Sequence, residues 1–89
     1  MNHTYTISLN AINGLSVLPR IALVFSRRRL KIDHLRMHES PIHGLAHLDI
    51  VLDCDQNTTV RLIQQLRRIV EVADISVSHG DELANGSPG

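Results

Sequence analysis

The chain has 89 residues, which is enough for one domain and too few for two. Its nine basic and nine acidic side chains give a formal net charge of zero, which argues against a general polyanion binder that gains affinity from neutralised phosphates. The single cysteine, Cys54, excludes an intrachain disulfide, and the most apolar segment, residues 15–25, is too short to span a bilayer. We expect a cytoplasmic protein with no signal peptide and no membrane contact.

The first half of the chain predicts a strand, a helix and a second strand. Residues 4–10 alternate between polar and apolar side chains, as in a half-buried strand. Apolar residues then recur at helical spacing from Leu18 to Phe25, which predicts a helix that ends at about Arg29. Residues 31–40 follow as a second strand, in which Leu35 and Met37 face the core.

Pro19 decides where the first helix is expected to begin. Proline is tolerated in the first turn of a helix but costs about 3 kcal/mol or more further in. We therefore predict a start near Ser16, with the Ser16 hydroxyl as the N-cap, and reject Asn13 as the cap because it would place Pro19 in the second turn.

The second half of the chain repeats this order. Residues 40–44 predict a hairpin loop, and the third strand, residues 45–53, should turn Leu48, Ile50 and Leu52 inwards. Residues 58–70 predict a helix, and a last strand should bury Ala73, Ile75 and Val77. Residues 80–89 are polar and rich in glycine, and we expect a disordered tail. The helix's buried stripe should hold Leu62, Ile63, Leu66, Ile69 and Val70.

The predicted order is strand, helix, strand, strand, helix, strand, so the fold class is α+β with the ferredoxin-like βαββαβ plan. Both helices should cover one face of a four-stranded antiparallel sheet whose strand order, 4-1-3-2, places the second strand on an edge. The domain spans residues 1–79, and the other face of the sheet is polar and open.

Three functions find little support on this scaffold. RNA-recognition domains stack bases on sheet aromatics, where this chain has residues such as Ser8 and Asp49. The histidine pairs 34/38 and 43/47 would lie about 13 Å apart on strands, too far to share a metal ion, although His38 and His47 could meet across the hairpin. An enzyme needs an activated nucleophile, and the acids beside Cys54 would raise its pKa instead.

A small-ligand or regulatory module remains. The segment that joins the first strand to the first helix carries Asn13 and Gly14 beside a helix N-terminus, where free amides suit a carboxylate. A plain strand-to-helix turn accounts for the same residues equally well, so the residues alone leave both interpretations open.

The segment NGLSVLPRIALVFSRRRLKIDHLRMHES resembles the N-terminal half of an ACT domain, and is most similar to the small, regulatory subunits of acetolactate synthase. LIQQLRRIVEVADISVSH is similar to that family's second helix and last strand, so the resemblance covers about residues 3–79. Against the family pattern, Ser16 replaces a glycine that opens the helix, Lys31 an asparagine and Arg29 a frequent glycine. The matching positions are Leu18, Arg20, Ile21, Phe25, Ser26, Ile32 and Leu35.

The resemblance implies a homodimer that joins two sheets through their edge second strands. It also implies a site for an effector, a branched-chain amino acid such as valine, between the first loop of one copy and the second strand of the other. Carried over to this chain, the effector site comprises Asn13, Gly14, Leu15, Ser16, Leu30 and Lys31.

The short chain looks most like the small subunit of the valine-insensitive isozyme, which holds and activates a large catalytic subunit. The resemblance therefore implies a non-catalytic regulatory subunit in branched-chain amino acid biosynthesis, with no nucleic-acid partner. Thiamine diphosphate, magnesium and FAD would belong to the large subunit, and this chain would hold no cofactor or metal. A stand-alone ACT-domain sensor of an amino acid is the alternative.

Overall fold

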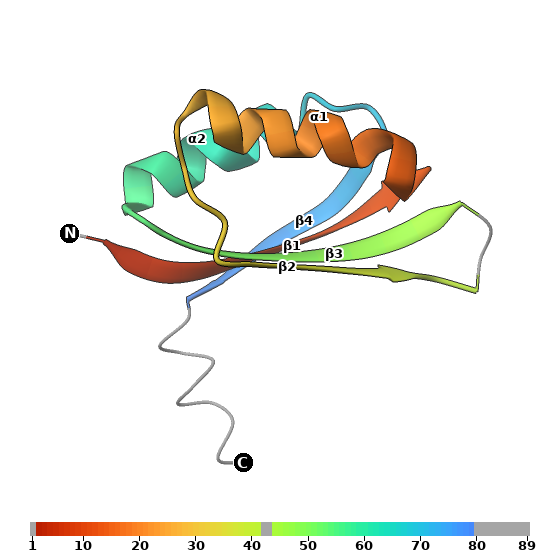
Figure 1. Cartoon of the computed structure of the whole chain (residues 1–89), viewed down its shortest axis with the longest axis horizontal. Helices are drawn as coiled ribbons and strands as arrows, with labels where there is room; N and C mark the ends of the chain where they lie inside the picture. The colour runs from red at the N-terminus through yellow and green to blue at the C-terminus, as the bar shows by residue number, and fades with distance from the viewer. Residues whose placement is uncertain (1, 42–43, 80–89) are drawn as a thin grey trace, which may run out of the picture.

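The computed structural model describes residues 2–41 and 44–79, and Figure 1 shows two helices covering one face of a sheet whose other face is open. The predicted tail, residues 80–89, and part of the predicted hairpin loop lie outside the described residues. In chain order the elements are β1 (His3–Ile12), α1 (Gly14–Arg27), β2 (His34–Glu39), β3 (Leu45–Cys54), α2 (Gln56–Leu66) and β4 (Val72–His79).

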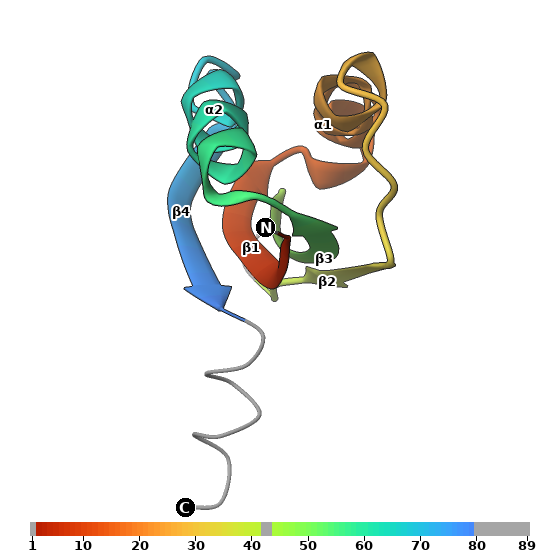
Figure 2. The same cartoon turned by 90° about the vertical axis from the view of Figure 1, so that its left-hand side faces the viewer.

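The four strands form one antiparallel sheet in the order β2-β3-β1-β4. This order confirms the predicted ferredoxin-like βαββαβ plan and places β2 on an edge. The helices lie side by side above the sheet when the molecule is seen from its end (Figure 2). β1, which leads into α1, and β3, which leads into α2, therefore pack in the same two-layer core.

The core lies between the sheet and the helices. Leu48, Ile50 and Leu52 on β3 have no exposed surface, as the alternation predicted. β1 contributes its alternate apolar residues, and each helix contributes an apolar stripe. The helical part of this core consists of Val17, Ile21, Phe25, Leu62 and Leu66.

The predicted start of α1 is wrong by two residues. The helix begins at Gly14, and Asn13 is its N-cap in the left-handed conformation (φ 56°, ψ 50°), with no side-chain cap. The amides of Ser16 and Val17 both donate to the Asn13 carbonyl, at 2.9 and 3.1 Å, so Ser16 lies inside the first turn. Pro19 therefore lies inside the helix, beyond its first turn and on its exposed side.

The end of α1 also comes before the predicted Arg29. The last helical residue is Arg27, and Arg29 takes a left-handed conformation with φ 56°. The Arg29 amide donates to the Ser26 carbonyl at 2.9 Å, and the Leu30 amide donates to the Phe25 carbonyl at 3.1 Å. This pair of bonds is a Schellman motif, which is usually closed by glycine at the position that Arg29 holds.

α2 is shifted towards the N-terminus from its predicted range. Its N-cap is Asp55, whose carboxylate accepts from the Thr58 amide at 2.7 Å, and it ends at Leu66. A tight turn follows, so Ile69 is only partly buried and Val70 is 92% exposed, and the prediction that Val70 is buried is wrong.

A bulge in β4 changes which residues face the core. The pairing with β1 shifts between Ser8 and Asn10, and Asp74 adopts φ 54° at this point. Ala73 therefore pairs with Asn10 on the open face and is exposed, while Val72 packs against the core. The predictions that Ala73 and Val77 are buried are wrong, since Val77 is 36% exposed, whereas Ile75 packs partly buried against the core as predicted.

Candidate ligand pocket at the start of the first helix

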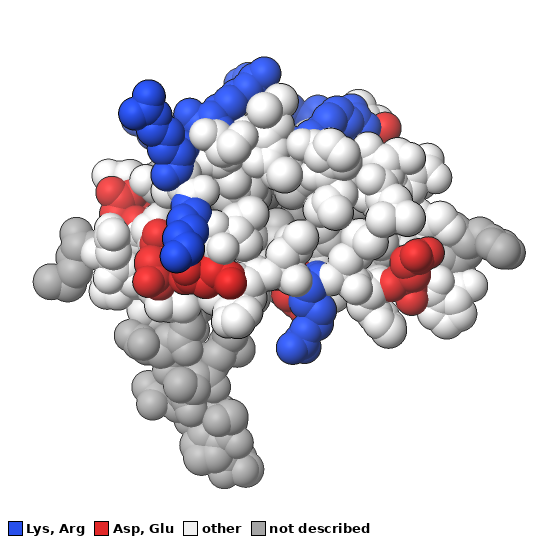
Figure 3. Space-filling view, in the orientation of Figure 1, with Lys and Arg blue, Asp and Glu red and all other residues white. Residues whose placement is uncertain are grey.

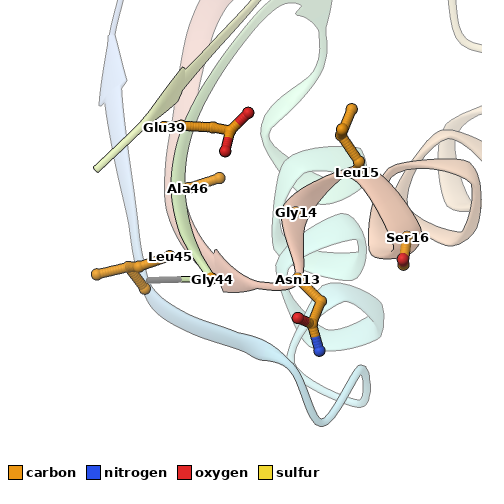
Figure 4. Close-up of a pocket in the computed structure, with 8 residues that line it drawn as sticks. All are labelled: Asn13, Gly14, Leu15, Ser16, Glu39, Gly44, Leu45 and Ala46. Atoms are coloured by element: carbon orange, nitrogen blue, oxygen red, sulfur yellow. The ribbon is translucent and has the colours of Figure 1, made fainter. Parts of the chain in front are cut away.

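An open pocket of about 230 Å³ lies where β1 gives way to α1. Its other wall is the end of the β2–β3 hairpin, which Figure 4 shows opposite the start of the helix. The pocket brings together four of the six predicted site residues, Asn13, Gly14, Leu15 and Ser16, with hairpin residues that were not predicted. The added lining residues are Glu39, Gly44, Leu45 and Ala46.

Gly14 is fixed at this position by packing. A Cβ atom on Gly14 would lie 2.5 Å from the Ala46 Cβ, a distance at which something must shift. The missing side chain lets the first turn of α1 approach β3 closely, which closes the back of the pocket. Gly14 is therefore the first residue of the helix and is held there by its contact with Ala46.

The first turn of α1 presents two amides to the pocket. Asn13 occupies the amides of Ser16 and Val17, whereas those of Gly14 and Leu15 have no acceptor among the described residues. The Asn13 amide donates to the Gly44 carbonyl, which ties the loop to the hairpin. Free amides at the positive end of a helix dipole are suited to an anionic group such as a carboxylate.

The opposite wall supplies the complementary charge. Glu39 is the last residue of β2 and pairs in register with Ala46, which is in contact with the start of α1. Figure 4 shows the Glu39 carboxylate on the pocket side of β2, and Leu15, 67% exposed, across the pocket at the start of α1. Two amides, a carboxylate and an apolar wall match the groups of an α-amino acid. Glu39 could not be assigned from the sequence, because its place depends on the hairpin register.

Leu30 and Lys31 lie away from this pocket in the same chain. They follow the C-terminal end of α1, whose 14 residues span about 21 Å. Lys31 is exposed, Leu30 packs partly against the core, and both precede the start of β2 at His34, not within the strand as predicted. Within one chain the six predicted residues therefore form two separate groups.

On the sheet face opposite the helices, polar side chains form hydrogen bonds with one another. Ser8 donates to the Asp49 carboxylate at 2.6 Å, and His47 lies 3.0 Å from both Asp49 and Asn10. The Ser8 hydrogen bond lowers the pKa of Asp49, helped by His47 and opposed by burial. His38 and His47 are register partners, as the hairpin made possible, but the described residues contain no group of three metal-binding side chains.

Cys54 is a packing residue. Its side chain is buried, and its sulfur lies 3.1 Å from the Thr59 hydroxyl. Burial raises the pKa of the Cys54 thiol, and the nearby charges of Asp55 and Asp53 add to this effect while the Thr59 hydrogen bond opposes it. The thiol is therefore protonated at neutral pH and is a poor nucleophile.

Several known proteins are similar to this chain. No family model matches the chain. It is 29% identical over 72 residues to a probable acetolactate synthase small subunit of Archaeoglobus fulgidus, covering 81% of this chain and 45% of that protein. It also resembles the crystal structure of the acetolactate synthase small subunit from Thermotoga maritima, at 27% identity and TM-score 0.73, over 83% of this chain and 46% of that one.

A third similar structure identifies the fold. The ACT domain from the GTP pyrophosphokinase of Chlorobium tepidum matches with TM-score 0.75 and 13% identity, over 88% of this chain and all of that domain. The chain therefore has the ACT-domain fold. Two of its likenesses are to acetolactate synthase small subunits, and the chain spans about half the length of each. No helix within residues 2–41 and 44–79 is long and apolar enough to cross a membrane.

Proposed function

We propose that this chain is a non-catalytic regulatory domain that dimerises and activates the large catalytic subunit of an acetolactate synthase, in branched-chain amino acid biosynthesis. The observation that supports it is the similarity to two small subunits along more than four fifths of the chain, on an ACT-domain fold.

In this proposal the catalytic chemistry belongs to the partner. The large subunit carries thiamine diphosphate, magnesium and FAD, and the complex works in the cytoplasm without a nucleic-acid or membrane partner. The present chain contributes surfaces that hold the catalytic subunit in an active arrangement. Its inert Cys54 and the internally bonded carboxylate of Asp49 are consistent with this division of roles.

The proposed dimer joins two copies through β2. This strand pairs with β3 on one side only, and Leu35 on it is 45% exposed. An unpaired strand edge is a template for another strand, and a second copy of β2 would cover it. The same contact would bring Leu30 and Lys31 of one copy towards the Asn13–Ser16 pocket of the other, as the family resemblance implies.

Reconstitution tests the function directly. The large subunit from the same genome is assayed for acetolactate formation alone and with increasing amounts of this chain. We expect the rate to rise and saturate at a fixed ratio of the two subunits. A rate that stays unchanged while an unrelated acetolactate synthase small subunit raises it would exclude the proposed role.

A second candidate, a stand-alone amino-acid sensor, is favoured by the free amides of Gly14 and Leu15 opposite Glu39. Calorimetry with valine, leucine and isoleucine separates it from the first. Binding at micromolar concentration that is lost in Glu39→Gln, where the ammonium group would lose its ionic partner, would support the sensor. If the wild-type chain and Glu39→Gln give the same heat of binding, the amino acid binds outside this pocket.

A further inference from the structure

The charges of this neutral chain are strongly segregated in space. Eight of its nine basic residues fall in residues 14–31 and 56–71, which are the two helices and the turns that follow them. These two segments contain one acidic residue, Glu71. Figure 3 shows the basic side chains gathered along the helical side and the acidic ones mostly along the sheet. The helical side is therefore a cationic surface that the net charge conceals.

A groove runs between the two helices near the C-terminal end of α1. It has a volume of about 540 Å³ and is lined by three arginines, three amide side chains and one valine, with no acidic residue among them. The Arg28 Nε donates to the Gln65 Oε1 at 3.3 Å across the groove, which holds one guanidinium against α2. The lining residues are Arg28, Asn57, Val60, Arg61, Gln64, Gln65 and Arg68.

No described acidic residue forms an ion pair within 4 Å with Arg61 or Arg68, whereas Arg20, on the same helical side, pairs with Glu71 at 2.7 Å. The hydrogen bonds from Thr58 lower the pKa of Asp55, and the charge of Arg61 adds to this effect, so Asp55 offsets part of the charge of that guanidinium. The cationic groups of Arg61 and Arg68 remain available to an external anion. Arginine, unlike lysine, presents a planar fork that binds a carboxylate through two parallel hydrogen bonds.

Apolar residues beside the arginines indicate a protein partner. Val60 in the groove is 48% exposed, and Leu23 on the outer side of α1 is 46% exposed. Exposed apolar side chains next to arginine are typical of protein–protein contacts. A single-stranded nucleic acid would require aromatic side chains for stacking, and the groove has none.

We propose that the arginine groove between α1 and α2, lined by Arg28, Arg61 and Arg68, docks an acidic surface of the catalytic subunit. This inference rests on the proposed function, which names the partner, and adds the surface that meets it. The carboxylates of the partner would pair with the guanidinium groups, while Val60 would be covered by an apolar side chain of the partner.

Binding is measured by biolayer interferometry between the full chain and the large subunit of the same genome, at several salt concentrations. We expect Arg61→Gln with Arg68→Gln to weaken binding about tenfold or more and to reduce its salt dependence. Arg27→Gln with Arg67→Gln is the matched control, since it also removes two exposed arginines but neither of them lines the groove, and it should change affinity less than about twofold. Thermal melts verify that each variant is folded.

The outcomes separate the two proposals. Wild-type binding that is equally strong in the groove variants would overturn the docking surface and leave the proposed function standing. A wild-type chain that does not bind the large subunit would overturn both. A 20-base-pair DNA duplex serves as the competing probe. If it binds tighter than the large subunit at the same salt concentration, and the groove variants abolish this, the groove is a nucleic-acid site and the docking proposal is wrong.

Discussion

The two ends of α1 are built in opposite ways. At its N-terminal end Gly14 is buried, and its Cα approaches Ala46 so closely that a Cβ atom would lie 2.5 Å from the Ala46 Cβ. At its C-terminal end Arg27 and Arg29 are exposed and the neighbouring groove is open. The N-terminal end is therefore held in place by close backbone packing, whereas the C-terminal end is an exposed surface whose main feature is its side-chain charge.

This difference predicts how each end responds to substitution. A change at the N-terminal end should alter the stability of the fold together with the pocket, since the same atoms form both. A change at the C-terminal end should alter binding with little effect on stability, because exposed charges contribute little to folding. Four substitutions test this difference between the two ends. The expected change in the free energy of unfolding decreases from the first to the last.

Gly14→Ala should lower the free energy of unfolding by about 1–3 kcal/mol, because the new methyl group overlaps with Ala46 and α1 must move away from β3. Urea denaturation measures this change. Ser16→Ala is the control in the same turn. It should cost less than about 0.5 kcal/mol, since Ser16 is exposed and does not cap the helix. A large loss of unfolding free energy in Ser16→Ala would instead indicate that the Ser16 hydroxyl caps the helix, as the sequence predicted.

The strands and the fold class were predictable because alternation of apolar side chains is a local signal. Residues 4–10 and 45–53 each bury their apolar set as that alternation requires. The βαββαβ order then leaves few topologies, and the observed one has the predicted edge strand. No local signal marks Asp74, whose left-handed conformation shifts the register and turns Ala73 outwards.

Part of the pocket lining was predictable for the same reason. Asn13–Ser16 were identified from one loop, and they do line one pocket. Glu39 was missed because it reaches that pocket only through the register of β2 on β3. The helix start was placed too late because the cost of proline beyond the first turn was taken to exclude an earlier start, whereas α1 begins at Gly14 and contains Pro19 beyond its first turn.

Pro19→Ala tests the middle of α1, between the two ends. The alanine amide can donate to the Leu15 carbonyl, so the free energy of unfolding should rise by about 1–2 kcal/mol, less than the full helix preference because the unfolded chain also gains freedom. Pro19→Gly should be about 1 kcal/mol less stable than the alanine variant. If Pro19→Ala gains nothing, the helix begins near Ser16 and proline lies in its first turn.

Arg29→Gly should stabilise the C-terminal end modestly. Arg29 closes α1 at φ 56°, a conformation that costs a side-chain-bearing residue about 1 kcal/mol and glycine almost nothing. We expect the unfolding free energy to rise by up to about 1 kcal/mol. Arg29→Ala removes the same charge but keeps the strained conformation, so it should not share this gain. Equal stabilisation in both variants would attribute the effect to charge repulsion among the neighbouring arginines.

Arg61→Gln should change the unfolding free energy by less than about 0.5 kcal/mol, because the arginine is exposed and has no ion pair within the described residues. The measurement is the urea midpoint at low and high salt. Any change should appear mainly at low salt, where the attraction of Arg61 to Asp55 and its repulsion by the other helical cations are both least screened. A salt-independent loss of more than about 1 kcal/mol would show that Arg61 supports the fold through packing of its stem, and the contrast between the two ends of α1 would then fail.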